Sequence, residues 1–426
     1  MRHLLAGLFL LALALRAAFV LYHAHLGWQL LFDPSYYLRL AANLDHGVYS
    51  LFHPRDIPDT TRMPGYPFFI HLLGGHIPLV LAAQVVISAA KVPLVFLLAR
   101  SCRVTQRAAF AAAALMAVEP IDVLLSGQVL TEAFFTTLVL AGSVALLASD
   151  QRRGAFLAAL AFAAAIWIRP NGLAVVLMAG LGSVLLLRRG IATGALLVGA
   201  SLVLVLPWVL RNGRETGRWV LSDSGPVAAA YFHVPEVLEH AGDDRAGGYR
   251  DQLFSEASAS DWEDPQEVGR FFRGLRRSVR SVFMDHPLSW SLVQGRKMAR
   301  TYVAPGRGHL MLFFGEHPDL RRSLLGLSLL FSLLLVMALA VWILHLRSIP
   351  RELVFVLLLA ATLLFTGGIS TPDARFKDPA MPLLLVGTAW AAGRIVPRSR
   401  LLGPHHYPND AGAVHGSPGT DLPEYR

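Results

Sequence analysis

Ten blocks of apolar sequence constrain this chain more than any other feature. They occupy about 4–22, 81–100, 107–120, 126–149, 154–168, 172–187, 191–210, 322–346, 351–369 and 379–393. A helix needs about 20 mainly apolar residues to cross a bilayer, and 54% of the residues are hydrophobic whereas only 16% are charged. This composition excludes a soluble globule and a disordered chain, and the single cysteine excludes a disulfide scaffold. We therefore predict an all-α polytopic membrane protein with about ten transmembrane helices.

The arginines between these blocks indicate how the helices are oriented. They cluster in alternate gaps, at Arg2; Arg100, Arg103 and Arg107; Arg152 and Arg153; Arg188 and Arg189; Arg347 and Arg351; and Arg394, Arg398 and Arg400. Short loops rich in Lys and Arg stay on the cytoplasmic side, so we predict that these gaps and both termini are cytoplasmic. This placement accounts for the net charge of +9, and we expect no nucleic-acid partner. Residues 1–22 start like a signal peptide, but Arg16 interrupts them and no clean cleavage site follows, which favours a retained anchor.

The predicted topology leaves two long segments outside the membrane, residues 23–63 and 211–305. Two further apolar pieces, 64–75 and 309–316, are too short to span and are expected at the interface. The tail at 397–426 is rich in Gly, Pro, His and charge, which is typical of a disordered segment. The sequence has no Walker motif, zinc-finger spacing or glycine-rich dinucleotide turn. The outer loops must therefore hold whatever chemistry the chain performs.

The first outer loop carries an aspartate soon after the first span. Asp33 precedes apolar positions that recur at helical spacing from Tyr36 to Leu44, which predicts a short helix lying along the interface. Asp33 and Pro34 suit the cap and first turn of this helix, so Asp33 is either a helix cap or a catalytic acid. Arg62, in the segment RMPGYP, likewise suits either a lipid headgroup or a substrate phosphate.

The large outer loop contains a basic amphipathic segment at 264–284. Its apolar residues follow the i, i+3, i+4, i+7 spacing of a helix, opposite a row of arginines. Asp264 as cap, Pro265 at the first position and Glu267 three residues after the cap predict where the helix starts. Such a helix either lies on the outer leaflet or packs as a scaffold against the first loop. The histidines of this large loop lack the spacing of metal ligands, so the sequence predicts no metal site.

Five segments resemble, in their order along the chain, the GT-C glycosyltransferases. They are the first outer loop with its Asp33, Tyr-Tyr pair, AANLDHG and RMPGYP; SGQVLTEAFFT at 126–136; IRPNG at 168–172; LPWVLRN at 206–212; and DARFKDPAMP at 373–382. The closest resemblance is to the bacterial branch with protein O-mannosyltransferases and lipid A aminoarabinose transferases. It runs over about 1–395 and implies one transmembrane glycosyltransferase domain at 1–396. The chain is shorter and has fewer predicted spans than the larger members, and we expect it to lack their separate C-terminal soluble domain.

The resemblance implies an inverting glycosyltransferase that uses a polyprenyl-phosphate-linked sugar at the outer face of the bacterial inner membrane. Its acceptor would be a glycan, a lipid or a protein, and some relatives use a divalent cation. Such a reaction needs a carboxylate for the acceptor and cations for the leaving phosphate. The resemblance suggests Asp33 and Glu132 as the acids. The candidates for substrate and phosphate binding are Arg62, Tyr66, Arg169, Arg211, Arg375 and Lys377.

Two other functions fit the same sequence. A transporter or flippase of lipid-linked sugars would also have many spans, but transporters place polar groups near the middle of the membrane. A non-catalytic relative of the glycosyltransferases is the third possibility, and the intact Asp33 argues against it. Lys91 is ambiguous, because a charge within the block at 81–100 is either functional or a lysine that extends to the interface.

Overall fold

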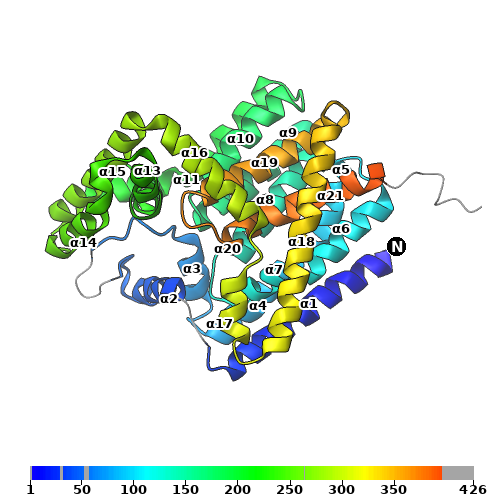
Figure 1. The fold of residues 1–426 in the computed structure, drawn as a ribbon, viewed down its shortest axis with the longest axis horizontal. Helices are drawn as coiled ribbons and strands as arrows, with labels where there is room; N and C mark the ends of the chain where they lie inside the picture. The colour runs from blue at the N-terminus through cyan, green and yellow to red at the C-terminus, as the bar shows by residue number, and fades with distance from the viewer. Residues whose placement is uncertain (1, 29–31, 52–56, 263, 396–426) are drawn as a thin grey trace, which may run out of the picture.

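A computed structural model describes residues 2–28, 32–51, 57–262 and 264–395, and the predicted tail at 397–426 lies outside the described residues. Every regular element in these ranges is a helix (Figure 1). The helices longer than one turn are α1 (Arg2–His25), α2 (Phe32–Asn43), α3 (Gly65–Leu72), α4 (Ile77–Ala89), α5 (Lys91–Ser101), α6 (Gln106–Val118), α7 (Pro120–Ser126), α8 (Glu132–Ala148), α9 (Gln151–Ile168), α10 (Gly172–Leu185), α11 (Ile191–Thr216), α12 (Ser224–Ala228), α13 (Val234–Ala241), α14 (Tyr249–Ala259), α15 (Pro265–Asp285), α16 (Pro287–Val303), α17 (Arg307–Phe314), α18 (Pro318–Leu344), α19 (Arg351–Gly367) and α21 (Met381–Ile395). The short α20 (Ala374–Lys377) precedes α21.

Each of the ten apolar blocks forms helix, but the helices differ in length. Within the described ranges, four stretches are long and apolar enough to cross a membrane: His3–His25, Ile77–Ser101, Ile191–Thr216 and Pro318–Leu344. A fifth results if α6 and α7 are one span bent by 50°. The bend lies at Pro120, which has no N–H to continue the α6 ladder. The multi-pass membrane class is therefore confirmed, whereas the count of ten spans stays a prediction.

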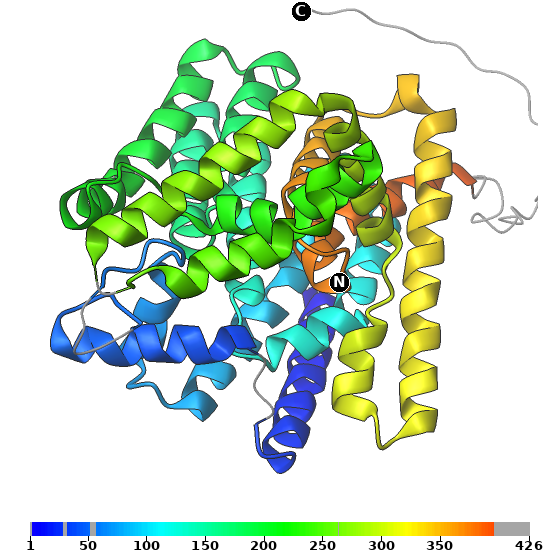
Figure 2. The same ribbon diagram turned by 60° about the vertical axis from the view of Figure 1, so that its left-hand side comes forward.

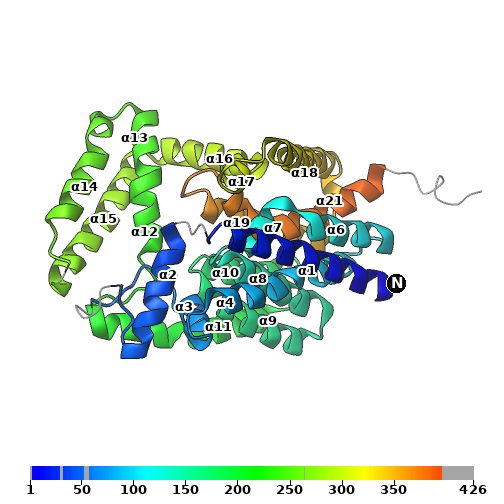
Figure 3. The ribbon, with the colours of Figure 1, turned by 90° about the horizontal axis from the view of Figure 1, so that it is seen from below.

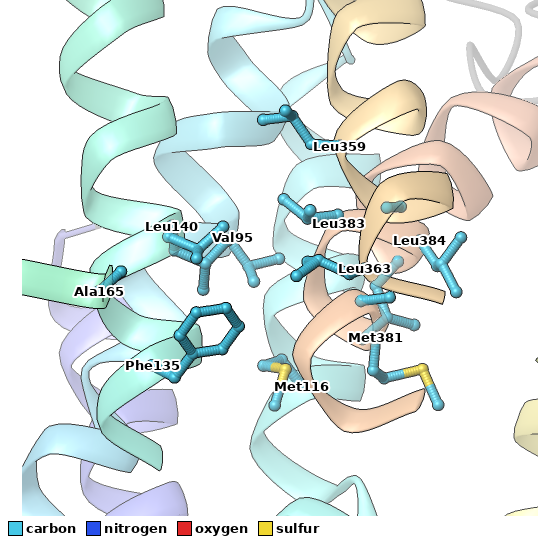
Figure 4. Packing of buried hydrophobic residues seen from close by; sticks show 14 of the residues in the cluster. Val95, Met116, Phe135, Leu140, Ala165, Leu359, Leu363, Met381, Leu383 and Leu384 are labelled. Carbon is cyan, nitrogen blue, oxygen red and sulfur yellow. The ribbon is translucent and has the colours of Figure 1, made fainter. Parts of the chain in front are cut away.

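The outer surface of the long helices suits lipid. Figure 2 shows α18 along one edge of the bundle, where Leu329, Leu330, Leu333 and Met337 are each about half exposed. A bilayer would remove this apolar surface from water. In the interior, Figure 4 shows Val95 and Leu140 opposite Leu363 and Leu383. Side chains from α5, α8, α19 and α21 thus form one continuous core.

The outer-loop helices gather at one end of the bundle. Figure 3 shows α2 and α12–α15 at the end opposite the N terminus. Helices α13–α15 share a second hydrophobic core, which includes Val234, Val237 and Leu238 of α13, whereas Leu40 of α2 belongs to the main core. The predicted short apolar pieces at 64–75 and 309–316 form α3 and α17, which are eight residues each.

The amphipathic segment forms α15 with the predicted start. Asp264 caps it by accepting a hydrogen bond from Gln266 N at 2.8 Å. Its apolar residues Val268, Phe272 and Leu275 are buried in the second core. This part of the apolar face packs mainly on other helices of the large outer loop, which supports a scaffold role. Phe283 and Met284 near the end of α15 remain exposed, and contact with the outer leaflet stays a prediction.

Candidate active site

Arg375 joins two carboxylates that are far apart in the sequence. It lies on α20, which Figure 1 shows near the centre of the molecule, where α16 and α19 pack against it. Asp373 caps α20 by accepting from Arg375 N at 2.7 Å. The Arg375 guanidinium donates from Nη1 to Asp33 Oδ2 at 2.8 Å and from Nε to Glu132 Oε1. A single arginine thus bridges both acids that the sequence suggested.

Two more arginines complete the cluster. Arg62 Nη2 donates to Asp33 Oδ1 at 2.9 Å, and Arg169 Nη1 lies 3.2 Å from Glu132 Oε1. The residues come from the first turn of α2, the segment before α3, the first turn of α8, the link between α9 and α10, and α20. We call Asp33, Arg62, Glu132, Arg169 and Arg375 the carboxylate–arginine cluster. All five were predicted from the sequence.

Local structure explains the position of each residue. Glu132 is the first residue of α8, where the helix dipole favours an acid. Arg169 follows the last residue of α9, and the helix ends there because the next residue, Pro170, disfavours helical backbone at position 169. Asp33 lies in the first turn of α2. The interpretation of Asp33 as only a helix cap is wrong, since its two oxygens accept from Arg62 and Arg375.

The electrostatics of the cluster keep Asp33 ionised. Burial opposes the charge of Asp33, but the guanidinium groups of Arg375 and Arg62 outweigh it and hold the pKa of Asp33 below its usual value. Burial would lower the pKa of Arg375, but Glu132 and Asp33 raise it. Three arginines and two carboxylates leave the cluster with a net charge of +1.

One side of the cluster is accessible. The side chains of Asp33 and Arg62 are 26% and 27% exposed, whereas that of Glu132 is fully buried. Glu132 Oε2 has no hydrogen-bond partner within the described part of the chain. The cluster therefore offers an accessible carboxylate at Asp33 and an unsatisfied acceptor deeper inside, both next to guanidinium groups.

Three predicted substrate-binding residues lie outside the cluster. Tyr66 is buried and donates its hydroxyl to Gln84 Oε1 at 2.7 Å. Lys377 is buried and donates to Ala304 O at 2.7 Å. Arg211 donates to the carbonyl oxygens of Asp59 at 2.9 Å and Tyr49 at 3.1 Å. Each of these side chains is turned toward protein acceptors, and its role in binding substrate or phosphate stays a prediction.

Lys91 belongs to a buried ionic network that the sequence did not reveal. Lys91 is 1% exposed and pairs with Asp122, which also pairs with Arg16. Arg16 also donates from Nε to Ser88 Oγ at 2.9 Å. Lys91 therefore does not extend to the interface. Arg16, which interrupts the first apolar block, was the available signal for this network, but its partner is 106 residues away.

The described residues do not fit a divalent cation. No group of three or more His, Cys, Asp and Glu side chains in the described ranges comes close enough to hold a metal ion. The two acids of the cluster already neutralise arginines, and the net charge of +1 repels a cation. Divalent ions need several oxygen ligands, and this cluster does not supply them.

Comparison with known proteins finds likeness in fold among the solved structures. Neither a protein-family profile nor a curated protein matches the sequence. The fold is similar to that of the archaeal oligosaccharyltransferase AglB from Archaeoglobus fulgidus, solved in complex with an inhibitory peptide and a dolichol-phosphate, with a TM-score of 0.49 and 16% identity. The match covers 92% of this chain and 50% of that chain, so the chain spans about half of AglB. The function is therefore inferred from the geometry of the cluster and from the sequence motifs.

Proposed function

We propose that this protein is an inverting glycosyltransferase that moves a sugar from a polyprenyl-phosphate carrier to a glycan, lipid or protein acceptor. The reaction would take place at the outer face of the bacterial inner membrane, with both termini in the cytoplasm. The observation that carries the proposal is the carboxylate–arginine cluster, in which Arg375 bridges Asp33 and Glu132. It supplies at one place the carboxylate and the cations that this chemistry needs.

The charge of the cluster suits the donor. A sugar joined to a polyprenyl phosphate is a phosphodiester with one negative charge, which matches the net +1 of the cluster. Arg62 contacts Asp33 through Nη2, and its other guanidinium N–H groups, which have no hydrogen-bond acceptor among the residues that the structure describes, could donate to phosphate oxygens. Planar guanidinium groups bind phosphate through two parallel hydrogen bonds. We assign Arg62, Arg169 and Arg375 to the carrier phosphate.

The transfer step follows from these positions. Asp33 accepts the proton of the acceptor hydroxyl or amine, and the acceptor oxygen or nitrogen forms a bond to the anomeric carbon. The bond between that carbon and the phosphate oxygen breaks, and its electron pair leaves with the polyprenyl phosphate. The phosphate thereby becomes a monoester with a second negative charge, and the arginines stabilise this developing charge. Attack opposite the phosphate inverts the anomeric centre.

A comparison of strains tests the function without knowledge of the sugar. Mass spectra of glycolipids and envelope glycans are recorded for the parent, a deletion strain and the complemented strain. The deletion strain should lack one glycosyl modification, and complementation should restore it. Identical spectra in the parent and the deletion strain would refute the proposal.

The alternative function, a transporter of lipid-linked sugars, draws support from the buried network of Arg16, Lys91 and Asp122. Ionisable groups within a membrane bundle often mark a transport path. An assay in detergent separates the two functions: the purified protein is mixed with a lipid extract of the deletion strain and an acceptor extract, and free polyprenyl phosphate is measured. A transferase should release free polyprenyl phosphate. A transporter should leave the donor intact, because detergent provides no second compartment.

A further inference from the structure

Asp223 links three outer segments and lies outside the carboxylate–arginine cluster. Its side chain is fully buried in the turn between α11 and α12. Oδ2 accepts from Thr60 Oγ1 and from Arg218 Nη1, both at 2.6 Å, and Oδ1 accepts from Arg276 Nη2. Thr60 belongs to the first outer loop, Arg218 to the start of the large outer loop, and Arg276 to α15. Arg218 is five residues from Asp223 in sequence, whereas Arg276 and Thr60 are 53 and 163 residues away, so one carboxylate connects its own segment to two distant ones.

The segment bound by Asp223 carries Arg62. Besides the side-chain bond, Asp223 N donates to Thr60 O at 2.9 Å. Arg218 Nη2 donates to Thr60 Oγ1 at 3.0 Å, and Ser222 Oγ donates to Thr61 O at 2.8 Å. Residues 218–223 thus hold the backbone and side chain of Thr60, two positions before the arginine that pairs with Asp33.

A turn transmits this support to Arg62. Asp59 Oδ1 accepts from Thr61 N at 2.7 Å and from Arg62 N at 2.8 Å, so residues 59–62 form one rigid unit. Arg211 holds the start of this unit by donating to the carbonyl oxygen of Asp59 at 2.9 Å. The position of the Arg62 side chain beside Asp33 therefore depends on contacts made by the large outer loop.

We propose that Asp223 is a positioning residue that fixes Arg62 against Asp33, with Arg276 anchoring it to α15. Burying the charges of Asp223 and its arginine partners costs desolvation free energy. The carboxylate joins the large outer loop to the segment that carries Arg62, which is the role that we propose for it. A displacement of about 1 Å in a group that orients a substrate lowers a rate on the order of 100-fold. The effect on transfer rests on the proposed function, whereas the effect on the position of Arg62 does not.

Two matched pairs of variants separate this role from general stability. Thr60→Val has nearly the same shape but loses the hydroxyl between Asp223 and Arg218, whereas Thr60→Ser keeps the hydroxyl. Arg276→Ala removes the anchor on α15. Arg273→Ala removes an equal charge one turn earlier on that helix, where Arg273 is exposed and forms no ion pair among the residues that the structure describes.

Amide hydrogen exchange of the purified full chain in detergent tests the position directly, well below the melting temperature. Exchange of the Thr61 and Arg62 amides should accelerate about five- to tenfold in Thr60→Val and Arg276→Ala, on the scale of one lost hydrogen bond. It should stay at the parental rate in Thr60→Ser and Arg273→Ala. Parental exchange in both Thr60→Val and Arg276→Ala would overturn the proposal.

The affinity of the same proteins for decaprenyl phosphate is a second measurement. A purely structural role of Asp223 would leave this affinity unchanged. The affinity should fall several-fold in Thr60→Val and recover in Thr60→Ser. Faster exchange with parental affinity in Thr60→Val would overturn the positioning of Arg62. If the parental chain does not bind decaprenyl phosphate, the proposed function fails, and the exchange comparison still decides the role of Asp223.

Discussion

Arg375 Nη1 lies 2.8 Å from Asp33 Oδ2, although the two residues are 342 positions apart in the sequence. The contact joins the loop before the last helix to the first outer loop. Because Arg375 also contacts Glu132 at the start of α8, the site exists only when both ends of the chain have packed around the middle. The same arginine keeps the pKa of Asp33 low, and in the proposed reaction it would stabilise the charge of the leaving phosphate.

Arg375→Ala should abolish most of the transfer activity. Losing one charge-assisted donor to a developing oxyanion costs about 2.7–4 kcal/mol of barrier, or roughly 100- to 1,000-fold in rate. Arg375→Lys should remain impaired, because lysine keeps the charge but lacks the planar fork. Restoration of the missing glycan by each variant in the deletion strain measures the effect. Arg322→Ala, on an exposed part of α18, is the control, and full activity in Arg375→Ala would remove this residue from the site.

Asp33→Asn should abolish transfer while the protein still inserts and folds. The amide has almost the same shape and is an equally good residue near a helix start, whereas loss of a general base costs about 100- to 10,000-fold in rate. Transfer by the purified protein is compared with its binding of decaprenyl phosphate, which should persist because the arginines remain. A parental transfer rate in Asp33→Asn would leave Glu132 as the acidic candidate.

Asp122→Asn should destabilise the protein strongly. It leaves Arg16 and Lys91 buried without the carboxylate that pairs with both. Breaking a buried ion pair by removing one partner costs about 3–5 kcal/mol. Thermal unfolding in detergent measures the loss. Adding Lys91→Met should recover part of it, because Lys91 would keep only the more distant carboxylate of Asp378, at 3.9 Å. Equal unfolding temperatures for the parent and Asp122→Asn would show that the network does not contribute to stability.

His233 should make the large outer loop sensitive to acid. Its side chain is fully buried against Trp290, and burial, followed by the charge of Lys297, lowers the pKa of His233 from 6.5 to about 4. Between these values the unfolded chain binds a proton that the folded chain does not, so stability falls as the pH drops from about 6.5 toward 4. The loss reaches up to about 3 kcal/mol at the lower end.

The variant His233→Phe tests this pH dependence, because it keeps a ring against Trp290 and cannot take up a proton. Unfolding temperatures recorded from pH 8 to pH 4 should decline less steeply for the variant than for the parent. Parallel declines would assign the acid sensitivity to other groups.

The topology follows from the arginine alternation and can be measured with reporter fusions. Fusions after Asp150 and Arg189 should read cytoplasmic, because short loops with Lys and Arg stay inside. Fusions near Asp244, in the large outer loop, should read external. An external signal at Arg189 would reverse the orientation and place the carboxylate–arginine cluster on the wrong side for an outer-face acceptor.

The sequence alone determined the membrane class and the positions of the apolar helices. The five residues of the cluster were among eight candidates, of which the two acids came from the resemblance to GT-C glycosyltransferases. Long apolar blocks can satisfy their backbone polar groups in lipid only as helices or closed barrels, and this constraint is visible within each block. The start of α15 at Asp264, Pro265 and Glu267 was likewise predictable, because a helix cap depends only on neighbouring residues. The motifs around Asp33, Glu132 and Arg375 identified side chains that the fold then brought together.

Only the tertiary structure decided which partner each polar side chain has. Tyr66 and Lys377 stand in the same motifs as Arg62 and Arg375, yet they bind Gln84 and Ala304. Arg211, in the motif LPWVLRN, binds the backbone of the first loop. The partner of a charge depends on packing between segments that are distant in sequence, as with Arg16 and Asp122 or Thr60 and Asp223. Hydropathy and helical periodicity describe which face of a segment is buried. Hydropathy and periodicity do not identify the segment that packs against that face, because the packing partner depends on how the helices are arranged in three dimensions.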